Sequence, residues 1–371
     1  MSRRTLRAGL AAGAATLLTL TGVAAHADPN PTDPGTPISG KSQTELYAAV
    51  GADAFAELTN NVVSAYDAQA PAPAHLLESY DAVNPVTGQT PETITTKPGC
   101  PISRPNGANG GLSAILLNQK STVDNTSYCI DWVRSSRAKK TDGTEAGLTF
   151  YAQSQDAVSY AVVGNAYAPT TPLTTAQLKD IFECTDTDWS QVGGQAGPIH
   201  VYLPPASAAT LTFFLQAIGT TLNNVQAGCQ GLPTVFSQQQ NDGRTMNGDP
   251  MGIAPYAVTK WAAQSNQAPG IADNRGGTHI GLVNTTTSPI TTTVLNNVTY
   301  DVLNPAFTTG DSTAFGRLFF NAVRNDAPQD LKDVFKAGGF LCQNQDAFLV
   351  PFGNTPLGND QNAARFCGQA S

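Results

Sequence analysis

Residues 173–182 read Leu-Thr-Thr-Ala-Gln-Leu-Lys-Asp-Ile-Phe, and this stretch predicts a short amphipathic helix. Thr174 and Gln177 stand three residues apart, the spacing of a capping box, in which each side chain bonds a backbone N–H of the other residue. The apolar residues that follow lie on one face of the predicted helix. They are Leu178, Ile181 and Phe182.

Strand patterns lie on both sides of this helix. The β-branched or aromatic runs 148–151 and 158–163 precede it, and each run predicts a buried strand. Alternating apolar residues around Val201 predict a further strand, and residues 211–218 predict a helix that ends at Gly219. Because strands alternate with helices, we expect an α/β fold with parallel strand pairs.

The N-terminal part of the chain continues the alternation. Apolar residues from Phe55 to Ala65 share one helical face, and Asp53 is placed to cap the first turn. A Gly-rich run at 106–111 opens a short helix. Residues 128–133 predict a strand that ends in Arg-Ser-Ser-Arg.

The first 27 residues are predicted to be a secretory signal peptide. Three Arg precede a mildly apolar stretch, and Ala25-His26-Ala27 supplies a cleavage site before Asp28. Cleavage removes three Arg and no acidic residue, so the net charge changes from −8 to −11. No Cys precedes Cys100, so no lipid anchor is expected and the protein is expected to be secreted. Residues 28–42 are rich in Pro, Gly and Asp and predict a flexible leader.

The composition excludes several classes of protein. Only 13% of the 371 residues are charged, against about 25% in an ordinary domain. The 40% of hydrophobic residues is enough to build a core. A net negative charge has the wrong sign for nucleic acid or an anionic membrane, so neither is an expected partner. No other stretch reaches about 18 apolar residues, so no membrane span is predicted.

Six cysteines in an exported chain favour disulfides over a metal site. Oxidising compartments favour disulfides, and the close C-x₂-C spacing of zinc sites does not occur. Six cysteines allow 15 connectivities, so the sequence leaves the pairing open. Nearest-neighbour pairing would close loops worth about 3–4 kcal/mol each. The six are Cys100, Cys129, Cys184, Cys229, Cys342 and Cys367.

Signatures of catalysis are missing from the sequence. The three histidines after the signal peptide lie far apart, and no nucleophile elbow, Walker A loop or dinucleotide fingerprint occurs. A phosphoester hydrolase would therefore rest on fold analogy alone. We expect no enzyme activity and no cofactor.

Three segments of small polar residues stand before a predicted helix or directly after a predicted strand, and such places can bind anions. Free N–H groups and the helix dipole favour negative charge there. The segments are Gly51-Ala52-Asp53, Ser135-Ser136-Arg137 and Ser207-Ala208-Ala209-Thr210. Ordinary helix capping explains each segment when it is taken alone. Their recurrence suggests a common site.

In sequence order, these segments resemble the actinobacterial branch of the phosphate-type substrate-binding proteins of ABC transporters. The most specific match runs from Thr174 to Gly194. Shorter matches include Arg104-Pro105-Asn106-Gly107, Asn241-Asp242-Gly243 and Asn274-Arg275-Gly276-Gly277. The resemblance spans about residues 45–280.

The resemblance implies a type 2 periplasmic-binding fold, with two α/β lobes that close on a ligand about a hinge. Lobe 1 would comprise residues 43–155 plus 253–371, and lobe 2 residues 156–252. The crossing strands would lie near residues 150–157 and 252–256. Phosphate or a similar oxyanion would be the ligand, an ABC-transporter permease the partner, and a monomer the functional form.

The same resemblance implies which residues bind the oxyanion. Asp53 would accept a hydrogen bond from the hydroxyl of protonated phosphate. Sulfate has no such hydroxyl, so its binding would be weaker. The implied donors are Arg134, Ser135, Arg137, Ser207 and Thr210.

The chain departs from the family pattern at four positions. Ala52 replaces a Ser, Ala208 and Ala209 replace Gly, and Leu211 replaces an Arg. An added methyl group narrows the space for close backbone approach. These departures support an alternative hypothesis, a secreted interaction protein that keeps the fold and has lost anion binding.

Overall fold

The computed structural model describes residues 28–30, 33–164, 167–206 and 208–371. Two sequence predictions lie outside these described residues. They are the signal peptide at 1–27 and the site residue Ser207.

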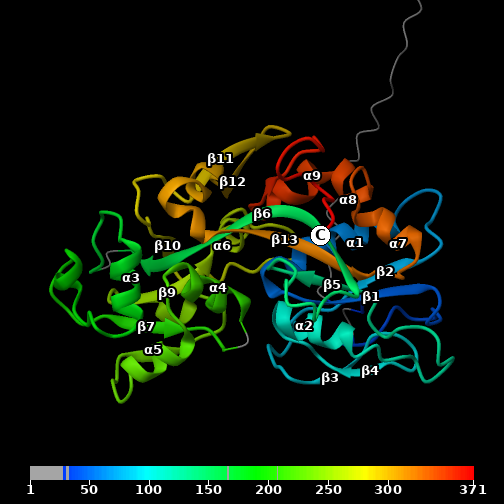
Figure 1. Cartoon of the computed structure of the whole chain (residues 1–371), viewed down its shortest axis with the longest axis horizontal. Helices are drawn as coiled ribbons and strands as arrows, with labels where there is room; N and C mark the ends of the chain where they lie inside the picture. The colour runs from blue at the N-terminus through cyan, green and yellow to red at the C-terminus, as the bar shows by residue number, and fades with distance from the viewer. Residues whose placement is uncertain (1–27, 31–32, 165–166, 207) are drawn as a thin grey trace, which may run out of the picture.

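One mixed sheet of ten strands runs through the whole molecule (Figure 1). Its strands are β1 (Leu46–Gly51), β2 (Leu76–Ser79), β5 (Trp132–Ser135), β6 (Leu148–Val163), β7 (His200–Leu203), β8 (Val235–Ser237), β9 (Gly252–Ala257), β10 (Thr278–Ile280), β13 (Gly316–Arg324) and β14 (Thr355–Pro356). The order is β2-β1-β5-β13-β6-β9-β7-β8, and β10 and β14 also pair with β6. Strand β1 is parallel to β2 and β5, and β7 is parallel to β8 and β9, which confirms the predicted α/β fold with parallel pairs.

At one end of the sheet, helices cover both faces of β2, β1 and β5. One face carries α1 (Ala56–Asp67), α7 (Gln329–Phe335), α8 (Phe340–Gln343) and α9 (Gln345–Leu349), and the other carries α2 (Gly107–Leu116). Leu58, Trp132 and Phe348 share the core on the first face, and Leu112 and Val133 share the core on the second. We call this part the α1 half.

The other end of the sheet has its own core. Helices α3 (Thr175–Phe182), α4 (Ala209–Ala217) and α5 (Leu222–Gly228) pack around β7, β8 and β9 (Figure 1). Phe182, Trp189, Phe214 and Phe315 are buried together in this core. We call this part the α4 half. Helix α6 (Val258–Ser265) touches both cores, because Val258 packs in the α4 half and Ala263 in the α1 half.

Two predicted strands turn out to be one. Strand β6 runs for 16 residues without a break, through the polar stretch that separates the two apolar runs. The polar side chains of this stretch are buried and bonded to distant residues. Gln153 accepts from Asn321, Ser154 donates to Asn354, and Asp156 pairs with Arg317.

Strands β6 and β13 join the two halves. Strand β13 begins beside Phe315 in the core of the α4 half and reaches Phe319 in the core of the α1 half. The second crossing strand was expected near 252–256, and that expectation is wrong. Strand β9 occupies those residues and pairs with β6 and β7 inside the α4 half.

The local helix signals are confirmed at α3. The hydroxyl of Thr174 accepts a hydrogen bond from the Gln177 N–H at 3.1 Å, and the Gln177 side chain accepts from the Thr174 N–H at 2.9 Å. Leu178, Ile181 and Phe182 are buried, as the spacing predicts.

Three disulfides join neighbouring cysteines in the sequence. The bonds are Cys100–Cys129, Cys184–Cys229 and Cys342–Cys367. Each disulfide lies within one half of the molecule: Cys184–Cys229 in the α4 half and the other two in the α1 half. The nearest-neighbour pairing is thus the one the fold adopts.

The segment that follows the predicted cleavage site packs against the α1 half. The carboxylate of Asp28 is completely buried and pairs with Arg104, whose Nη2 lies 2.8 Å from Asp28 Oδ2. The N–H of Ile38 donates to Glu78 Oε1 at 2.6 Å. The leader therefore bonds to the body of the protein at Asp28 and at Ile38.

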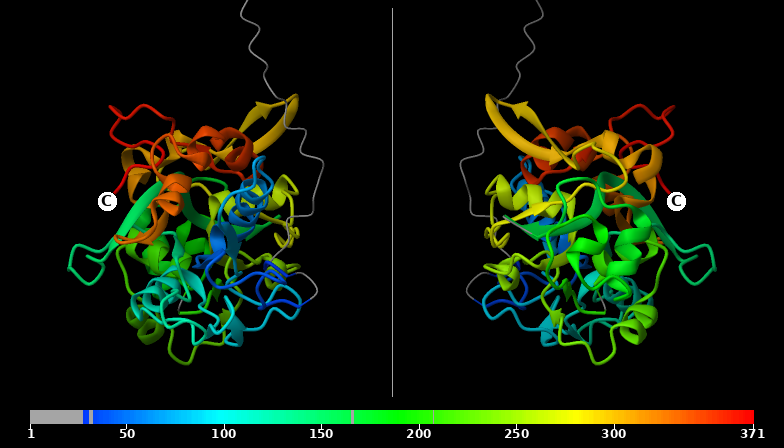
Figure 2. Two further views of the ribbon diagram at one scale, coloured as in Figure 1. Left: turned by 90° about the vertical axis from the view of Figure 1, so that its right-hand side faces the viewer. Right: turned by 90° about the vertical axis from the view of Figure 1, so that its left-hand side faces the viewer.

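Two small hairpins lie apart from the main sheet. One pairs β3 (Thr93–Thr95) with β4 (Pro101–Ser103), and the other pairs β11 (Ile290–Leu295) with β12 (Val298–Leu303). The β11–β12 hairpin projects from the molecule (Figure 2). No helix in the described parts of the chain is long and apolar enough to cross a bilayer.

Candidate functional site

The three segments singled out in the sequence meet where the two halves touch. Gly51 pairs with Arg134 at the ends of β1 and β5, so the first two segments are adjacent. Helices α2 and α4 are in contact, and Ala209 at the start of α4 packs in the same core as Ala54 and Phe55. Segments far apart in sequence therefore lie together at this junction.

Close backbone approach at this place depends on two glycines. Gly51 has a φ of 130°, and a Cβ there would lie 2.3 Å from the Arg134 carbonyl oxygen. A Cβ on Gly111 of α2 would lie 2.8 Å from the Gly51 Cα. Only glycine allows the middle of α2 and the ends of β1 and β5 to come this close.

Asp53 opens a 3₁₀ turn, η1 (Asp53–Phe55), that precedes α1. The prediction that it caps the helix is wrong, because the N-cap residues are Ala52 and Phe55. Burial raises the pKa of the Asp53 carboxyl, the Lys260 ammonium lowers it, and the Glu57 carboxylate raises it further. The net effect is a carboxyl whose pKa lies above its usual range.

Lys260, on α6, supplies the cation beside Asp53. Its Nζ lies 2.5 Å from Glu57 Oε2, and only 7% of its side chain is exposed. Burial acts to lower the pKa of Lys260, but the carboxylates of Glu57 and Asp53 outweigh burial and raise it. A lysine on the helix that contacts both cores thus balances a pair of carboxylates from the α1 half.

Arg134 is turned into the protein. It is completely buried, and its guanidinium donates to the Ala52 carbonyl, to Ser79 Oγ and to the Tyr80 carbonyl. Burial lowers its pKa, and the carboxylate of Asp81 acts against that. In this arrangement Arg134 holds the backbone before Asp53 in place.

Ser135 and Arg137 also bond within the α1 half. The Ser135 hydroxyl donates to the Arg137 carbonyl at 2.8 Å. The Arg137 guanidinium pairs with Glu145 at 2.5 Å and donates to Asn109 Oδ1 at 2.7 Å, beside the start of α2. These bonds fix the loop that follows β5.

Thr210 lies at the first turn of α4 and is buried. Its N-cap residue, Ala208, provides no capping side chain for the helix N–H groups. The nearest side-chain donor is Arg317, whose Nη2 lies 3.4 Å from Thr210 Oγ1. Leu211 is buried in the core of the α4 half.

Sequence reasoning missed Arg317, Lys260 and Asp156. Arg317 pairs with Asp156 at 2.7 Å across β13 and β6, and Asp156 also accepts from the Thr259 hydroxyl at 2.7 Å. No motif marks these residues. The available signal was a charge within the apolar run 315–323, since a charge in a buried strand needs a partner.

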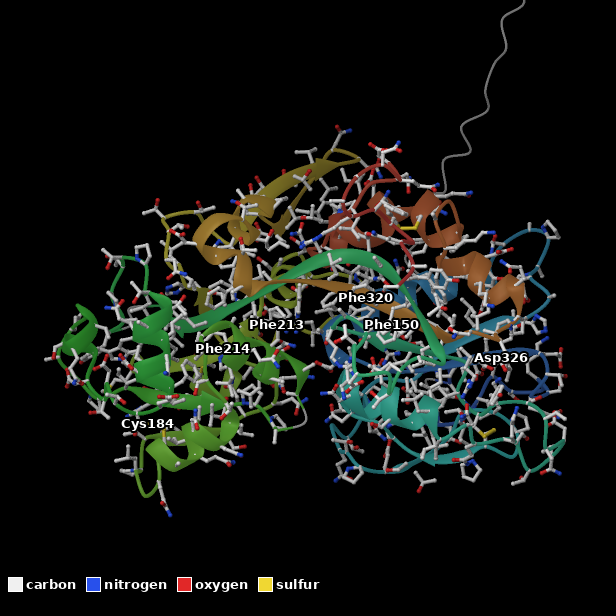
Figure 3. All side chains as sticks on the ribbon, viewed as in Figure 1. Phe150, Cys184, Phe213, Phe214, Phe320 and Asp326 are labelled. Carbon is white, nitrogen blue, oxygen red and sulfur yellow. A yellow bond between two sulfur atoms is a disulfide. The ribbon has the colours of Figure 1, made fainter. Side chains whose placement is uncertain are left out.

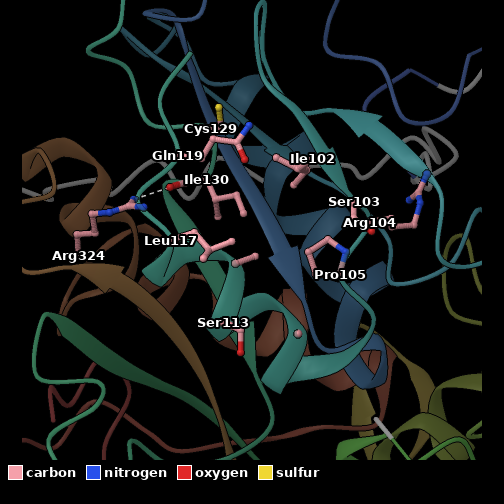
Figure 4. Close-up of a pocket in the computed structure, with 12 residues that line it drawn as sticks. Ile102, Ser103, Arg104, Pro105, Ser113, Leu117, Gln119, Cys129, Ile130 and Arg324 are labelled. Atoms are coloured by element: carbon pink, nitrogen blue, oxygen red, sulfur yellow. Dashed lines mark hydrogen bonds between the residues drawn. The ribbon is translucent and has the colours of Figure 1, made fainter. Parts of the chain in front are cut away.

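A pocket of about 320 Å³ lies beside α2 (Figure 4). It is lined by apolar residues such as Ile102 and Leu117 and by Arg104 and Arg324. Arg324 donates to the Ile130 and Ile115 carbonyls, and Arg104 is paired with Asp28. Both guanidinium groups are already bonded to the protein, so the pocket has few free donors for an anion.

In the described ranges, no group of three or more His, Cys, Asp and Glu side chains could hold a metal ion. His75 and His200 each pair with a single aspartate, Asp330 and Asp249 respectively.

Comparison with known proteins gives one family match and several structural matches. The family model of the PBP superfamily domain matches residues 129–340. No curated protein matches the chain.

The structural matches are distant in sequence. An ABC-type phosphate transport receptor from Vibrio cholerae aligns with a TM-score of 0.55 and 16% identity, over 83% of this chain and 98% of that one. A putative phosphate ABC transporter substrate-binding protein from Clostridium perfringens, solved with bound phosphate, aligns with a TM-score of 0.50 and 14% identity, over 76% and 88%. A human phosphate binding apolipoprotein aligns with a TM-score of 0.50 and 17% identity, over 85% and 92%. At these identities the likeness is one of fold.

Proposed function

Because the chain belongs to the PBP superfamily, we propose that it is a non-catalytic binding protein for phosphate or a related oxyanion. The convergence of the ends of β1 and β5 with the start of α4 carries this proposal. Helix starts and hydroxyls donate to anions, and a site between two halves excludes water and strengthens such bonds. The matched proteins named for phosphate support the choice of ligand.

We also propose two lobes that close on the ligand, expected at 43–155 plus 253–371 and at 156–252. The two separate cores support two lobes. Ile253, Leu303 and Phe315 pack in the core of the α4 half, whereas Ala263 and Ala268 pack in the core of the α1 half, so residues 253–315 contact both proposed lobes. Strands β6 and β13 would then carry the hinge.

The remaining proposals concern the protein's setting. We propose that it is exported and acts outside the cytoplasm as a monomer. Delivery of the anion to an ABC-transporter permease is the corresponding role in transport. The proposed site residues are Asp53, Arg134, Ser135, Arg137, Ser207 and Thr210. Because the guanidinium groups of Arg134 and Arg137 bond to the protein, we propose that these two support the site and do not contact the ligand directly.

Titration calorimetry of the secreted protein tests the proposal. After exhaustive dialysis, we expect inorganic phosphate to bind one per chain, with weaker binding of sulfate and of a sugar phosphate. Phosphate at 100 times its Kd should add about 2.7 kcal/mol to the free energy of unfolding, because it binds the folded state alone. Absence of heat and of thermal stabilisation with all three anions would favour a secreted interaction protein instead.

Asp53→Asn should narrow the preference for phosphate over sulfate by about tenfold or more. The carboxylate accepts a hydrogen bond from protonated phosphate and repels sulfate, whereas an amide can donate to either anion. Because the pKa of Asp53 is raised, lowering the pH should also narrow the wild-type preference. Competition calorimetry at two pH values measures both effects, and an unchanged ratio in the variant would remove Asp53 from this role.

A further inference from the structure

One buried arginine at the junction of the two halves has an unused donor. Arg317 is 5% exposed, and its Nη1 atom is buried without a hydrogen-bond partner. Its Nε and Nη2 atoms are occupied by Asp156, each 2.7 Å from Oδ2. A buried charged donor left unpaired is costly, so a group that accepts from Nη1 would stabilise the protein.

In other buried arginines, every guanidinium nitrogen donates a hydrogen bond within the protein. Arg324, on the same strand, donates through Nε, Nη1 and Nη2 to Asn118, Ile130 and Ile115. Arg134 likewise uses all three nitrogens. Across the described residues, Arg317 Nη1 is the one arginine nitrogen that is buried without a partner. The exception lies at the boundary between the halves.

The surroundings hold this guanidinium in one orientation. Its carbon lies 5.5 Å from the ring centres of Phe213, on α4, and Phe319, on β13. Phe213 lies on the side of α4 that faces the α1 half (Figure 3). Asp156 cannot turn away, because its Oδ1 accepts from Thr259 and its Oδ2 from Arg317. Asp156 is therefore a positioning residue for Arg317.

The start of α4 adds donors at the same place. Thr210 Oγ1 lies 3.4 Å from Arg317 Nη2. The first N–H groups of this nine-residue helix have no capping side chain from Ala208. An unpaired guanidinium nitrogen, a hydroxyl and a helix N-terminus together suit a small tetrahedral oxyanion.

We propose that Arg317, through Nη1, is the principal cationic donor to the oxyanion, together with Thr210 and the first N–H groups of α4. This inference rests on the proposed binding function and names the cation of the site. Leu211, directly after the start of α4, is buried and apolar, so the helix itself supplies no cation at this end. Arg317 brings a guanidinium to the same helix end from β13. Arg134, whose guanidinium bonds to the Ala52 carbonyl, then acts by holding the backbone before Asp53, and Arg137, paired with Glu145, acts by holding the loop that follows β5.

Arg317→Lys is the decisive substitution. Because lysine keeps the positive charge beside Asp156, the variant should still fold. It lacks the forked guanidinium donor that would bind the oxyanion. We expect the Kd for inorganic phosphate to rise by about 10- to 100-fold. Thr210→Val, which removes only the hydroxyl, should raise it by a smaller factor. Arg324→Lys on the same strand is the matched control and should leave the Kd unchanged.

The outcomes separate the two proposals. If the wild type binds none of the anions, the proposed function and this inference both fall. If the wild type binds phosphate and Arg317→Lys binds it equally well, only the inference falls. If Arg317→Lys does not fold, Thr210→Val decides, and an unchanged Kd in that variant overturns the inference. Thermal melting without ligand reports whether each variant is folded.

Discussion

Arg104→Met should lower the free energy of unfolding by about 3–5 kcal/mol. The side chains of Arg104 and Asp28 are both completely buried, and Nη1 and Nη2 of Arg104 bond the two carboxylate oxygens of Asp28 at 3.1 and 2.8 Å. Nε donates to Glu92 at 2.7 Å. Loss of the guanidinium would leave the Asp28 carboxylate without its cation, and a buried unpaired charge is strongly destabilising.

Urea denaturation of the secreted protein measures this effect. Arg275→Met is the matched control, because its pair with Asp273 lies at the surface and should be worth less than about 1 kcal/mol. Asp28→Asn combined with Arg104→Met should cost less than the two single losses added together, since the pair is lost only once. Equal losses from Arg104→Met and Arg275→Met would contradict a buried pair.

The fold was predictable where its signals are local. The capping box of α3 needs only Thr174 and Gln177, and the structure forms both of its bonds. The helix α2 and the α/β alternation follow from spacing within short windows. The disulfides also close between neighbouring cysteines, although sequence alone left the pairing open.

What could not be predicted depends on partners distant in sequence. Asp156 made β6 look like two strands, because its partner Arg317 stands 161 residues away. The same distance hid Arg317 itself, since nothing near it in the sequence shows that β13 passes the start of α4. Lys260 and Glu57 are 203 residues apart. Asp28 was expected in a flexible leader, because the composition of residues 28–42 gives no sign of Arg104.

The site residues divide in the same way. Asp53, Arg134 and Thr210 were chosen because they stand at strand ends or helix starts, and the fold brings their segments together. Spacing predicts where a residue stands along an element. It does not predict that the Arg134 guanidinium turns inward to the Tyr80 carbonyl while Arg317 reaches the helix from another strand. Side-chain direction is set by packing that only the folded chain provides.

Lys260→Met should also lower the free energy of unfolding, by about 3–5 kcal/mol at pH 8 and by less at pH 5. Methionine keeps much of the packing and removes the cation that faces Glu57, Asp53 and Asp81. Burial raises the pKa of Asp81 to about 7, and the pKa of Asp53 is raised as well. Without Lys260 the pKa of Asp53 should rise further, because the ammonium now lowers it.

The sign of the pH dependence follows from these shifts. A carboxyl whose folded pKa is raised stabilises the protein below its unfolded pKa, and this contribution is lost as the pH rises through the folded value. The difference in free energy of unfolding between the wild type and Lys260→Met should therefore grow between pH 5 and pH 8. Urea denaturation at both pH values measures this deficit. Lys260→Arg keeps the charge and should show little pH-dependent deficit. A deficit that is equal at both pH values would assign the loss to packing.

The same substitution links stability to binding. If Lys260 keeps Asp53 ionised, then Lys260→Met should shift the pH at which the preference for phosphate over sulfate disappears to a higher value. Asp53→Asn should narrow the preference at every pH, whereas in Lys260→Met the wild-type preference should return when the pH is raised enough to ionise Asp53. Competition calorimetry from pH 6 to pH 9 distinguishes the two. A preference in Lys260→Met that matches the wild type at each pH would mean that the ammonium does not control the Asp53 carboxyl.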